Sequence, residues 1–137
     1  MRRMLVAAVL LCAACAAFAP DYEREKRWAD EIVPGLVVGD AVRIETASKR
    51  SFLGILAESG KSRGAIILMH GSGVHPDFAI VGQLRSLLND AGFTTLSIQM
   101  PVLAANAPGD DYVAVFGEAG QAARRRRDIA CLACNRP

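Results

Sequence analysis

The sequence predicts an α/β fold, an open sheet in which two antiparallel strands precede a parallel β-α-β unit and a further helix. Residues 64–69, GAIILM, form a continuous apolar run, which is typical of a strand in a parallel sheet. Residues 77–91 carry apolar side chains at helical spacing, and residues 93–98 form a second short strand-like run. A strand, a helix and a strand in this order predict a right-handed crossover, which makes the two strands parallel.

Two strands are expected before this unit. Residues 41–46 alternate between apolar and polar side chains, as a half-buried strand does. Residues 47–50 form a polar turn, and residues 51–57 are the returning strand. Residues 58–63 form a polar loop that leads into the run at 64–69, which we expect to be buried on both faces of the sheet.

The helix at residues 77–91 has recognisable ends. Asp77 is expected to cap its N-terminus, and Gly92 to stop it. Its side chains facing the sheet are expected to be Phe78, Val81, Leu84, Leu88 and Ala91, with Ile80 and Leu87 beside them.

Two more helices flank the sheet elements. Residues 22–33 form a charged amphipathic helix that docks through Trp28 and ends at Pro34 and Gly35. Beyond the loop at 104–109, Asp110 or Asp111 is expected to cap the last helix. The inward residues of this last helix are expected to be Tyr112, Val113, Val115, Phe116 and Ala119.

Length and charge exclude several classes of protein. The chain has 137 residues, of which 52% are apolar, so it suits one small folded domain and is too apolar for a disordered chain. The net charge is +2, but the basic residues of the first three and last fourteen positions hide an acidic body. An acidic body disfavours nucleic acid as a partner. No repeat period is present, which excludes collagen, coiled coils and repeat arrays.

Residues 1–17 have the layout of a secretory signal peptide. Arg2 and Arg3 precede the apolar run MLVAAVLL, and small residues follow up to a cut after Ala17. The run is shorter than the ~20 apolar residues of a membrane-spanning helix. We therefore expect a periplasmic or secreted protein that meets the membrane only through this segment; the alternatives are a lipoprotein anchored through Cys15 and an uncleaved anchor.

The cysteines form two C-x-x-C pairs, one inside the signal segment and one at Cys131 and Cys134. A single C-x-x-C is half of a zinc site, and the second pair has no nearby histidine. We expect incidental cysteines, and neither a metal nor a cofactor.

The loop sequence HGSGVHPD follows the first parallel strand, at the sheet edge where ligands bind in open α/β folds. A P-loop is excluded because no lysine follows, and a dinucleotide loop is disfavoured because Pro76 stands where its third glycine should be. A metal site made by His70 and His75 lacks a completing carboxylate.

The fourth alternative is an oxyanion loop made by His70, Gly71, Ser72 and Gly73. A chain that turns tightly on glycine directs free backbone N–H groups into the crevice beyond the strand. Such fixed donors stabilise the negative oxygen that forms when an acyl carbon is attacked. In this interpretation the side chain of Ser72 matters less than its N–H group.

Residues 64–101, GAIILMHGSGVHPDFAIVGQLRSLLNDAGFTTLSIQMP, resemble the third strand, His-Gly loop, first helix and fourth strand of an α/β-hydrolase. The resemblance covers about residues 37–121, and the chain is similar to an uncharacterised group of exported proteobacterial hydrolase-like proteins. It implies hydrolysis of an ester, amide or similar acyl bond in a small-molecule substrate. It also implies that Ser72 supplies an oxyanion N–H and that His70 and Gly71 shape the loop, whereas the general base is a different, later histidine.

The rest of that catalytic set is not identified. One G-x-S-x-G occurs at residues 60–64, but it precedes a strand, whereas a nucleophile turn follows a strand and opens a helix. No nucleophile, acid or base is recognised, so we expect an incomplete α/β-hydrolase-like sheet that is inactive as written. The alternative function is a non-catalytic, exported, envelope-associated binding module.

The expected organisation is a signal peptide at 1–17, an amphipathic segment at 18–36, a partial hydrolase-like domain at 37–121 and a basic tail at 122–137. The tail contains four consecutive arginines and two cysteines, and we expect it to arise from a frameshift or truncation near residues 121–124. The alternative is a genuine basic tail that binds an acidic surface or lipid. An open apolar edge at residues 65–69 predicts low solubility.

Overall fold

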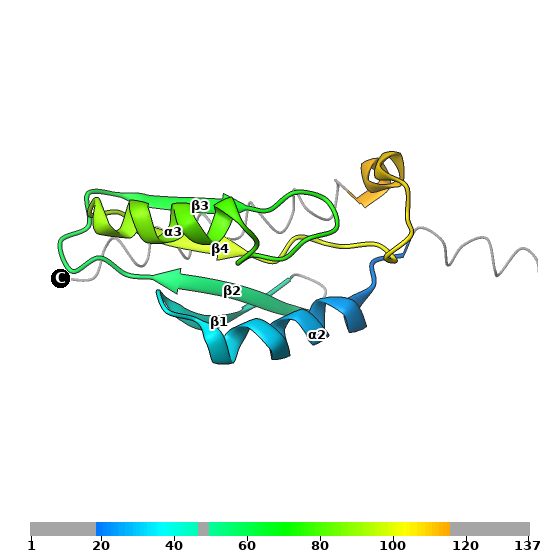
Figure 1. Cartoon of the computed structure of the whole chain (residues 1–137), viewed down its shortest axis with the longest axis horizontal. Coiled ribbons are helices and arrows are strands. Elements are labelled where there is room, and N and C mark those ends of the chain that lie inside the picture. Colours follow the sequence, from blue (N-terminus) through cyan, green and yellow to red (C-terminus); the bar gives the residue numbers. More distant parts are fainter. Residues whose placement is uncertain (1–18, 47–49, 116–137) are drawn as a thin grey trace, which may run out of the picture.

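The computed structural model describes residues 19–46 and 50–115 (Figure 1). The expected signal peptide at residues 1–17, all four cysteines and the basic tail at residues 122–137 lie outside the described residues. The elements are, in chain order, α2 (Tyr22–Ile32), the 3₁₀ turn η2 (Val33–Gly35), β1 (Asp40–Glu45), β2 (Ser51–Ala57), β3 (Ala65–Met69), α3 (Ile80–Asp90), β4 (Thr94–Ile98) and the 3₁₀ helix η3 (Gly109–Val115).

The four strands form one mixed sheet in the order β1-β2-β4-β3. The pairs β1–β2 and β2–β4 are antiparallel, and β3 runs parallel to β4 from Ala65 opposite Thr94 to Met69 opposite Ile98. The predicted hairpin and the predicted parallel β-α-β unit are both confirmed. The fold is therefore a mixed α/β fold built on a four-stranded sheet.

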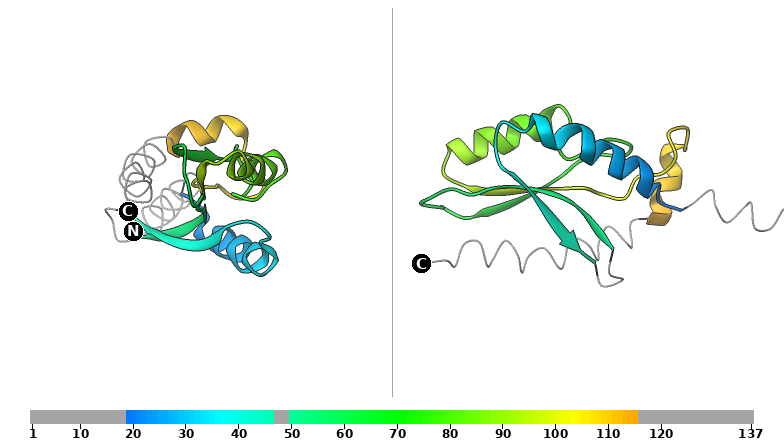
Figure 2. Two further views of the ribbon diagram at one scale, coloured as in Figure 1. Left: turned by 90° about the vertical axis from the view of Figure 1, so that its left-hand side faces the viewer. Right: turned by 90° about the horizontal axis from the view of Figure 1, so that it is seen from below.

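Helices α2 and α3 lie on the same side of the sheet in both views of Figure 2. The Ser97 hydroxyl donates a hydrogen bond to the carbonyl of Pro76, just before α3, at 2.5 Å. Side chains alternate along a strand, so Leu96 and Ile98 point to the opposite face, where they pack with Ile44 in a buried apolar cluster. The main apolar cluster and the polar contacts to the α3 segment therefore lie on different faces of β4.

Strand β3 differs from its prediction. It is the edge strand of the sheet, and Ala65 and Met69 at its two ends are exposed. The expectation of burial on both faces is wrong, because the side chains of β3 are exposed at its two ends and only partly buried between them. Within the described residues only β4 pairs with β3, so its other edge is open. The open apolar edge that motivated the prediction of low solubility is present, and the solubility itself stays a prediction.

Helix α3 begins at Ile80, three residues after the expected start. Asp77 does not cap it: the N-cap residue is Ala79, which has a φ of 45° and no side-chain capping bond. The carboxylate of Asp77 instead pairs with Arg85. The predicted C-terminal stop is confirmed, since Gly92 follows the helix with a φ of 87°.

The inward face of α3 also differs from the predicted apolar stripe. Four apolar side chains expected on or beside this face are exposed, one just before the helix and three within it: Phe78, Ile80, Leu84 and Leu87. The residue buried most deeply in the helix is Arg85, which is 3% exposed. Its guanidinium donates to the carbonyls of Val38 and Pro76, so the helix docks through polar contacts that periodicity does not reveal.

The two remaining helices agree only partly with expectation. Helix α2 is confirmed, with Asp21 accepting a capping bond from the N–H of Arg24. The last element is a 3₁₀ helix rather than an α-helix within the described residues, with Tyr112 and Val115 buried and Val113 exposed. Its expected members Phe116 and Ala119 lie outside the described residues. Over residues 19–46 and 50–115, no helix has the length and apolar character needed to cross a membrane.

Candidate functional site

The candidate site lies where β3 ends. His70, Gly71, Ser72 and Gly73, here called the HGSG loop, follow the carboxyl end of β3, next to the carboxyl end of its parallel neighbour β4. A small cavity of about 70 Å³ opens there. Its lining residues are His70, Gly71, Ser72, Met100, Pro101, Tyr112 and Val115. Three separate stretches of the chain thus meet at the position where ligands bind in open α/β sheets.

His70 ties the HGSG loop to the end of β4. Its Nε2 accepts a hydrogen bond from the N–H of Met100 at 2.9 Å, and the side-chain amide of Gln99 lies 3.0 Å from the same atom. With Nε2 accepting, the ring proton is on Nδ1, which donates to the carbonyl of Gly71 at 2.8 Å. The buried ring is fully used in holding the two strand ends together, a structural role that leaves no nitrogen to serve as a general base.

The backbone N–H groups of the last three residues of the HGSG loop, unlike the ring of His70, are not used in hydrogen bonds to the described residues. Gly71 and Ser72 are exposed, and the described part of the chain offers no hydrogen-bond partner to the N–H groups of Gly71, Ser72 and Gly73. Gly73 has a φ of 72°, a left-handed conformation that favours glycine. Gly71 and Ser72, which line the cavity, therefore carry N–H groups without a partner among the described residues.

Arg24 of α2 braces the loop from the far side. Its two terminal nitrogens donate to the carbonyl of Leu103 at 2.8 Å and to the carbonyl of Gly73 at 3.2 Å. The guanidinium also lies 4.5 Å from the ring centre of Trp28. A cation held by two carbonyls and an aromatic face fixes the HGSG loop relative to the segment after β4.

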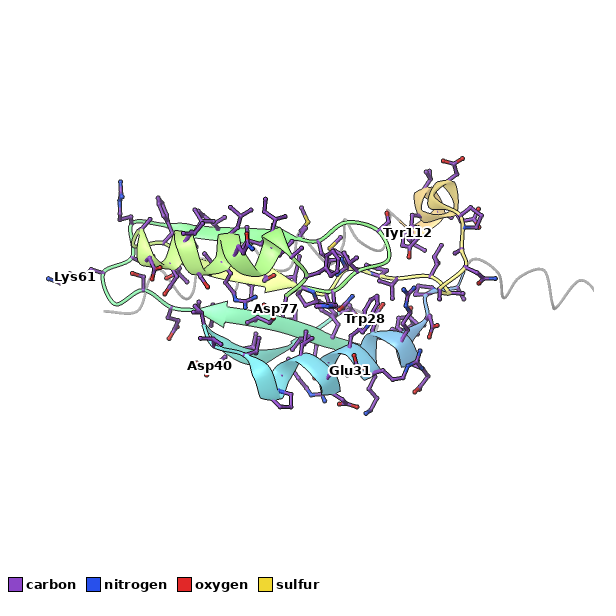
Figure 3. All side chains as sticks on the ribbon, in the orientation of Figure 1. Trp28, Glu31, Asp40, Lys61, Asp77 and Tyr112 are labelled. Atoms are coloured by element: carbon purple, nitrogen blue, oxygen red, sulfur yellow. The ribbon has the colours of Figure 1, made fainter. Side chains whose placement is uncertain are left out.

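A second link joins α2 to that segment. The N–H of Val102 donates to the carboxylate of Glu25 at 3.1 Å, and the N–H of Asp21 donates to the carbonyl of Val102 at 2.7 Å. Figure 3 shows Trp28 and Glu31 on α2, facing the loops that follow β3 and β4. The N-terminal helix is thus part of the site's support.

His75 lies between two aromatic rings. Its ring centre is 5.6 Å from those of Trp28 and Phe78, and its Nδ1 accepts a hydrogen bond from the N–H of Asp77. Burial lowers the pKa of His75 below 6.5, and the carboxylates of Asp77 and Glu31 oppose that shift. The folded protein therefore favours the neutral imidazole more than the unfolded chain does.

Stability should consequently fall in mild acid. The folded pKa of His75 lies below the unfolded value of about 6.5, so the unfolded chain binds the proton more readily. The contribution is complete above about pH 6.5 and is lost as the pH falls toward the folded pKa. Urea unfolding across this range should show a decreasing free energy of unfolding. His75→Gln should flatten that pH dependence, and an unchanged slope in the variant would contradict this assignment.

The G-x-S-x-G serine lies at the opposite end of β3 from the HGSG loop. The Ser62 hydroxyl donates to the carbonyl of Gly64 at 2.7 Å and accepts from the N–H of Thr94 at 3.2 Å. These bonds join the β2–β3 loop to the start of β4. The position is the one expected for a turn rather than for a nucleophile.

The predicted loop residues are thus together, but their supports were missed. Three supporting residues had no recognisable sequence signal: Arg24, Tyr112 and Gln99. An arginine in a charged helix looks like a surface residue, and a tyrosine in an apolar stripe looks like a core residue. Within the described ranges no group of three His, Cys, Asp or Glu side chains could hold a metal ion.

A larger groove lies away from the HGSG loop, between α2 and the β1–β2 hairpin. It has a volume of about 440 Å³. The residues that line it are mostly apolar, with a charged side chain of each sign: Ala29, Asp30, Val33, Pro34, Ala41, Val42, Arg43, Phe52 and Leu53.

Comparison with known proteins gives one match. The model of a protein family described as "Protein of unknown function (DUF3530)" matches residues 7–128, a range that includes every residue the structure describes. No curated protein and no solved structure matches the chain.

Proposed function

The chain belongs to the DUF3530 family of proteins of unknown function, and from this premise we propose that it carries the oxyanion-binding loop of an α/β-hydrolase-type site. The proposed reaction is hydrolysis of an ester, amide or similar acyl bond in a small-molecule substrate, in the periplasm or outside the cell. The observation that carries the proposal is the set of unused N–H groups at Gly71 and Ser72, beside a cavity at the carboxyl end of β3.

The chemistry follows from those donors. Attack on an acyl carbon turns its carbonyl oxygen into an oxyanion, and fixed N–H groups stabilise that charge without reorganising during the reaction. His70 and Arg24 supply the rigidity, since they hold the loop at Gly71 and Gly73 on either side of Ser72. This support gives the loop the preorganisation that such catalysis requires.

The nucleophile and its base are proposed to come from residues outside those described. Among residues 19–46 and 50–115, neither histidine has a nucleophile as its partner: His70 is bonded to Met100, and His75 to the N–H of Asp77. The Ser62 hydroxyl is engaged at the other end of the sheet. We expect the described residues by themselves to bind an acyl oxygen without turning over substrate.

The test distinguishes the backbone N–H group of Ser72 from its side-chain hydroxyl as the donor. The locus is first resequenced across the codons for residues 117–137, and its complete product is assayed with nitrophenyl acetate and butyrate. Ser72→Pro removes the N–H group and should lower turnover by about 10²- to 10³-fold, whereas Ser72→Ala keeps it and should stay within about twofold of wild type. Ser62→Ala, which changes a hydroxyl away from the site, should retain turnover.

Three results would overturn the proposal. The first is a complete gene product without esterase or amidase turnover. The second is equal turnover in Ser72→Pro and Ser72→Ala when circular dichroism shows both to be folded. The third is loss of turnover in Ser62→Ala, which would make the serine of residues 60–64 the nucleophile.

The second candidate function is a non-catalytic, exported, envelope-associated binding module. The observation that favours it is the groove of about 440 Å³ between α2 and the β1–β2 hairpin, with Arg43 and Asp30 among its lining residues. Mass spectrometry of material released from the denatured protein separates the two functions. A small amphiphile retained by wild type and lost in Val42→Trp, which fills the groove, would favour the binding module.

A further inference from the structure

Tyr112 is a buried polar residue at the same cavity. It comes from η3, more than thirty residues after the HGSG loop, and only 6% of its surface is exposed. Its side chain lines the cavity together with Gly71 and Ser72. Figure 3 labels Tyr112 on the side of η3 that faces the strand-end loops.

The hydrogen bonding of this hydroxyl is incomplete. Its oxygen accepts a bond from the N–H of Leu103 at 3.1 Å, which uses a lone pair and leaves the phenolic proton. No acceptor for that proton exists among residues 19–46 and 50–115. Since buried polar groups are nearly always paired, an unused O–H donor at a cavity indicates a place for an acceptor from outside the chain.

The hydroxyl is also close to the loop. A Cβ atom built on Gly73 would lie 3.5 Å from the Tyr112 oxygen, so no side chain separates the phenol from the turn of the loop. Gly71 and Ser72, whose N–H groups are unused, line the same cavity. Donors from the β3 loop and from η3 thus meet at one small volume.

The cavity restricts the ligand. Its volume of about 70 Å³ exceeds the roughly 10–15 Å³ that one water needs, and admits only a group of a few atoms. The lining includes no charged side chain, and Met100, Pro101 and Val115 make its other walls apolar. Uncharged donors in a small, mostly apolar pocket fit a single acyl or carboxylate oxygen with a small carbon group.

We propose that the Tyr112 hydroxyl is a third hydrogen-bond donor of the site, which binds the acyl or carboxylate oxygen of the ligand together with the N–H groups of the HGSG loop. This assignment rests on the proposed function, because it deepens the same site. It adds a donor from η3 that aligns the ligand oxygen against the loop, and it accounts for the tyrosine in an otherwise apolar helix face.

The probe is sodium formate, titrated into the full chain at constant ionic strength. Amide signals of Gly71 and Ser72 are followed by nuclear magnetic resonance, and Tyr112→Phe should weaken formate binding by about three- to tenfold, as the loss of one hydrogen bond predicts. Val113→Ala is the matched control. Val113 lies next to Tyr112 in η3, is 65% exposed and is not among the lining residues of the cavity, so the affinity of this variant for formate should stay near that of wild type.

A second measurement covers the case in which Tyr112→Phe does not fold. The chain has two tyrosines, so in Tyr22→Phe the ultraviolet tyrosine signal comes from Tyr112 alone. Formate should then produce a saturable tyrosine difference spectrum with the affinity given by the amide signals. No such spectrum, despite shifted amides, would overturn the assignment of Tyr112.

The outcomes separate this inference from the function on which it rests. Amide shifts that titrate equally in wild type and Tyr112→Phe would remove Tyr112 from the site and leave the loop as an oxygen-binding element. An absence of amide shifts at Gly71 and Ser72 in wild type would overturn both. Weaker formate binding in Tyr112→Phe, with normal binding in Val113→Ala, supports both.

Discussion

Replacing Arg85 by leucine is expected to lower the free energy of unfolding by about 3 kcal/mol, as is typical when one partner of a buried ion pair is removed. Arg85 is 3% exposed, and its guanidinium donates to Val38, Pro76 and Asp77. Leucine leaves two carbonyls without this donor and the Asp77 carboxylate without its cation. At roughly 4 to 8 °C per kcal/mol, the unfolding midpoint should fall by about 12 to 24 °C.

The exposed ion pair of α2 is the matched control. Lys26 and Asp30 are four residues apart, with side chains 68% and 65% exposed, and their interaction raises the pKa of Lys26. Lys26→Ala should leave the unfolding midpoint nearly unchanged, because solvent screens an exposed ion pair. Asp77→Ala combined with Arg85→Leu should cost less than the two single changes added together, because no charge is then left without its partner. Strict additivity, or a small loss in Arg85→Leu alone, would contradict this account.

Gly82→Ala is expected to destabilise the protein by about 2 kcal/mol, although alanine normally stabilises a helix over glycine by about 1 kcal/mol. A Cβ atom on Gly82 would lie 2.8 Å from Asp77 Oδ1 and 2.9 Å from the Asp77 carbonyl oxygen. Neither oxygen can move freely, because the carboxylate is held by Arg85 and the carbonyl belongs to the backbone. The added methyl must push α3 away from the segment that follows the HGSG loop.

Thermal and urea unfolding measure the effect of this change. Gln83→Ala, at the next and exposed position of the same helix, controls for helix propensity and should be nearly neutral. An increase in stability for Gly82→Ala would show that α3 does not sit against Asp77 as described. The Arg85 and Gly82 predictions both test the packing of α3 against Asp77, because Arg85 pairs with its carboxylate and Gly82 lies against its oxygens.

Several elements could be predicted because local patterns determine them. Alternation at β1 and the apolar run at β3 gave the strands, and the order of strand, helix and strand gave the parallel pairing. The HGSG loop was recognised because glycine beyond a strand end is a local signal. In each case the responsible physical preference acts over a few neighbouring residues.

The misassigned features depend on contacts between distant segments. Asp77 looked like a helix cap, but its carboxylate pairs with Arg85, and Ala79 takes the strained cap position. The predicted apolar stripe looked like the inward face of the helix, yet two of its members, Phe78 and Leu84, are exposed, whereas Arg85 is buried. Three carbonyl and carboxylate partners for one guanidinium outweigh an apolar face, and no periodicity reveals where those partners will lie.

The sequence by itself determined the α/β class, the strand order along the chain and the position of the HGSG loop after β3, because propensity and glycine flexibility are local properties. Only the tertiary structure decided what stands around that loop. It placed Arg24 against the carbonyl of Gly73, the His70 ring against the N–H of Met100, and the Tyr112 hydroxyl beside the cavity. Hydrogen bonds between segments tens of residues apart form only when the packed sheet brings their ends together, so a local pattern cannot reveal them.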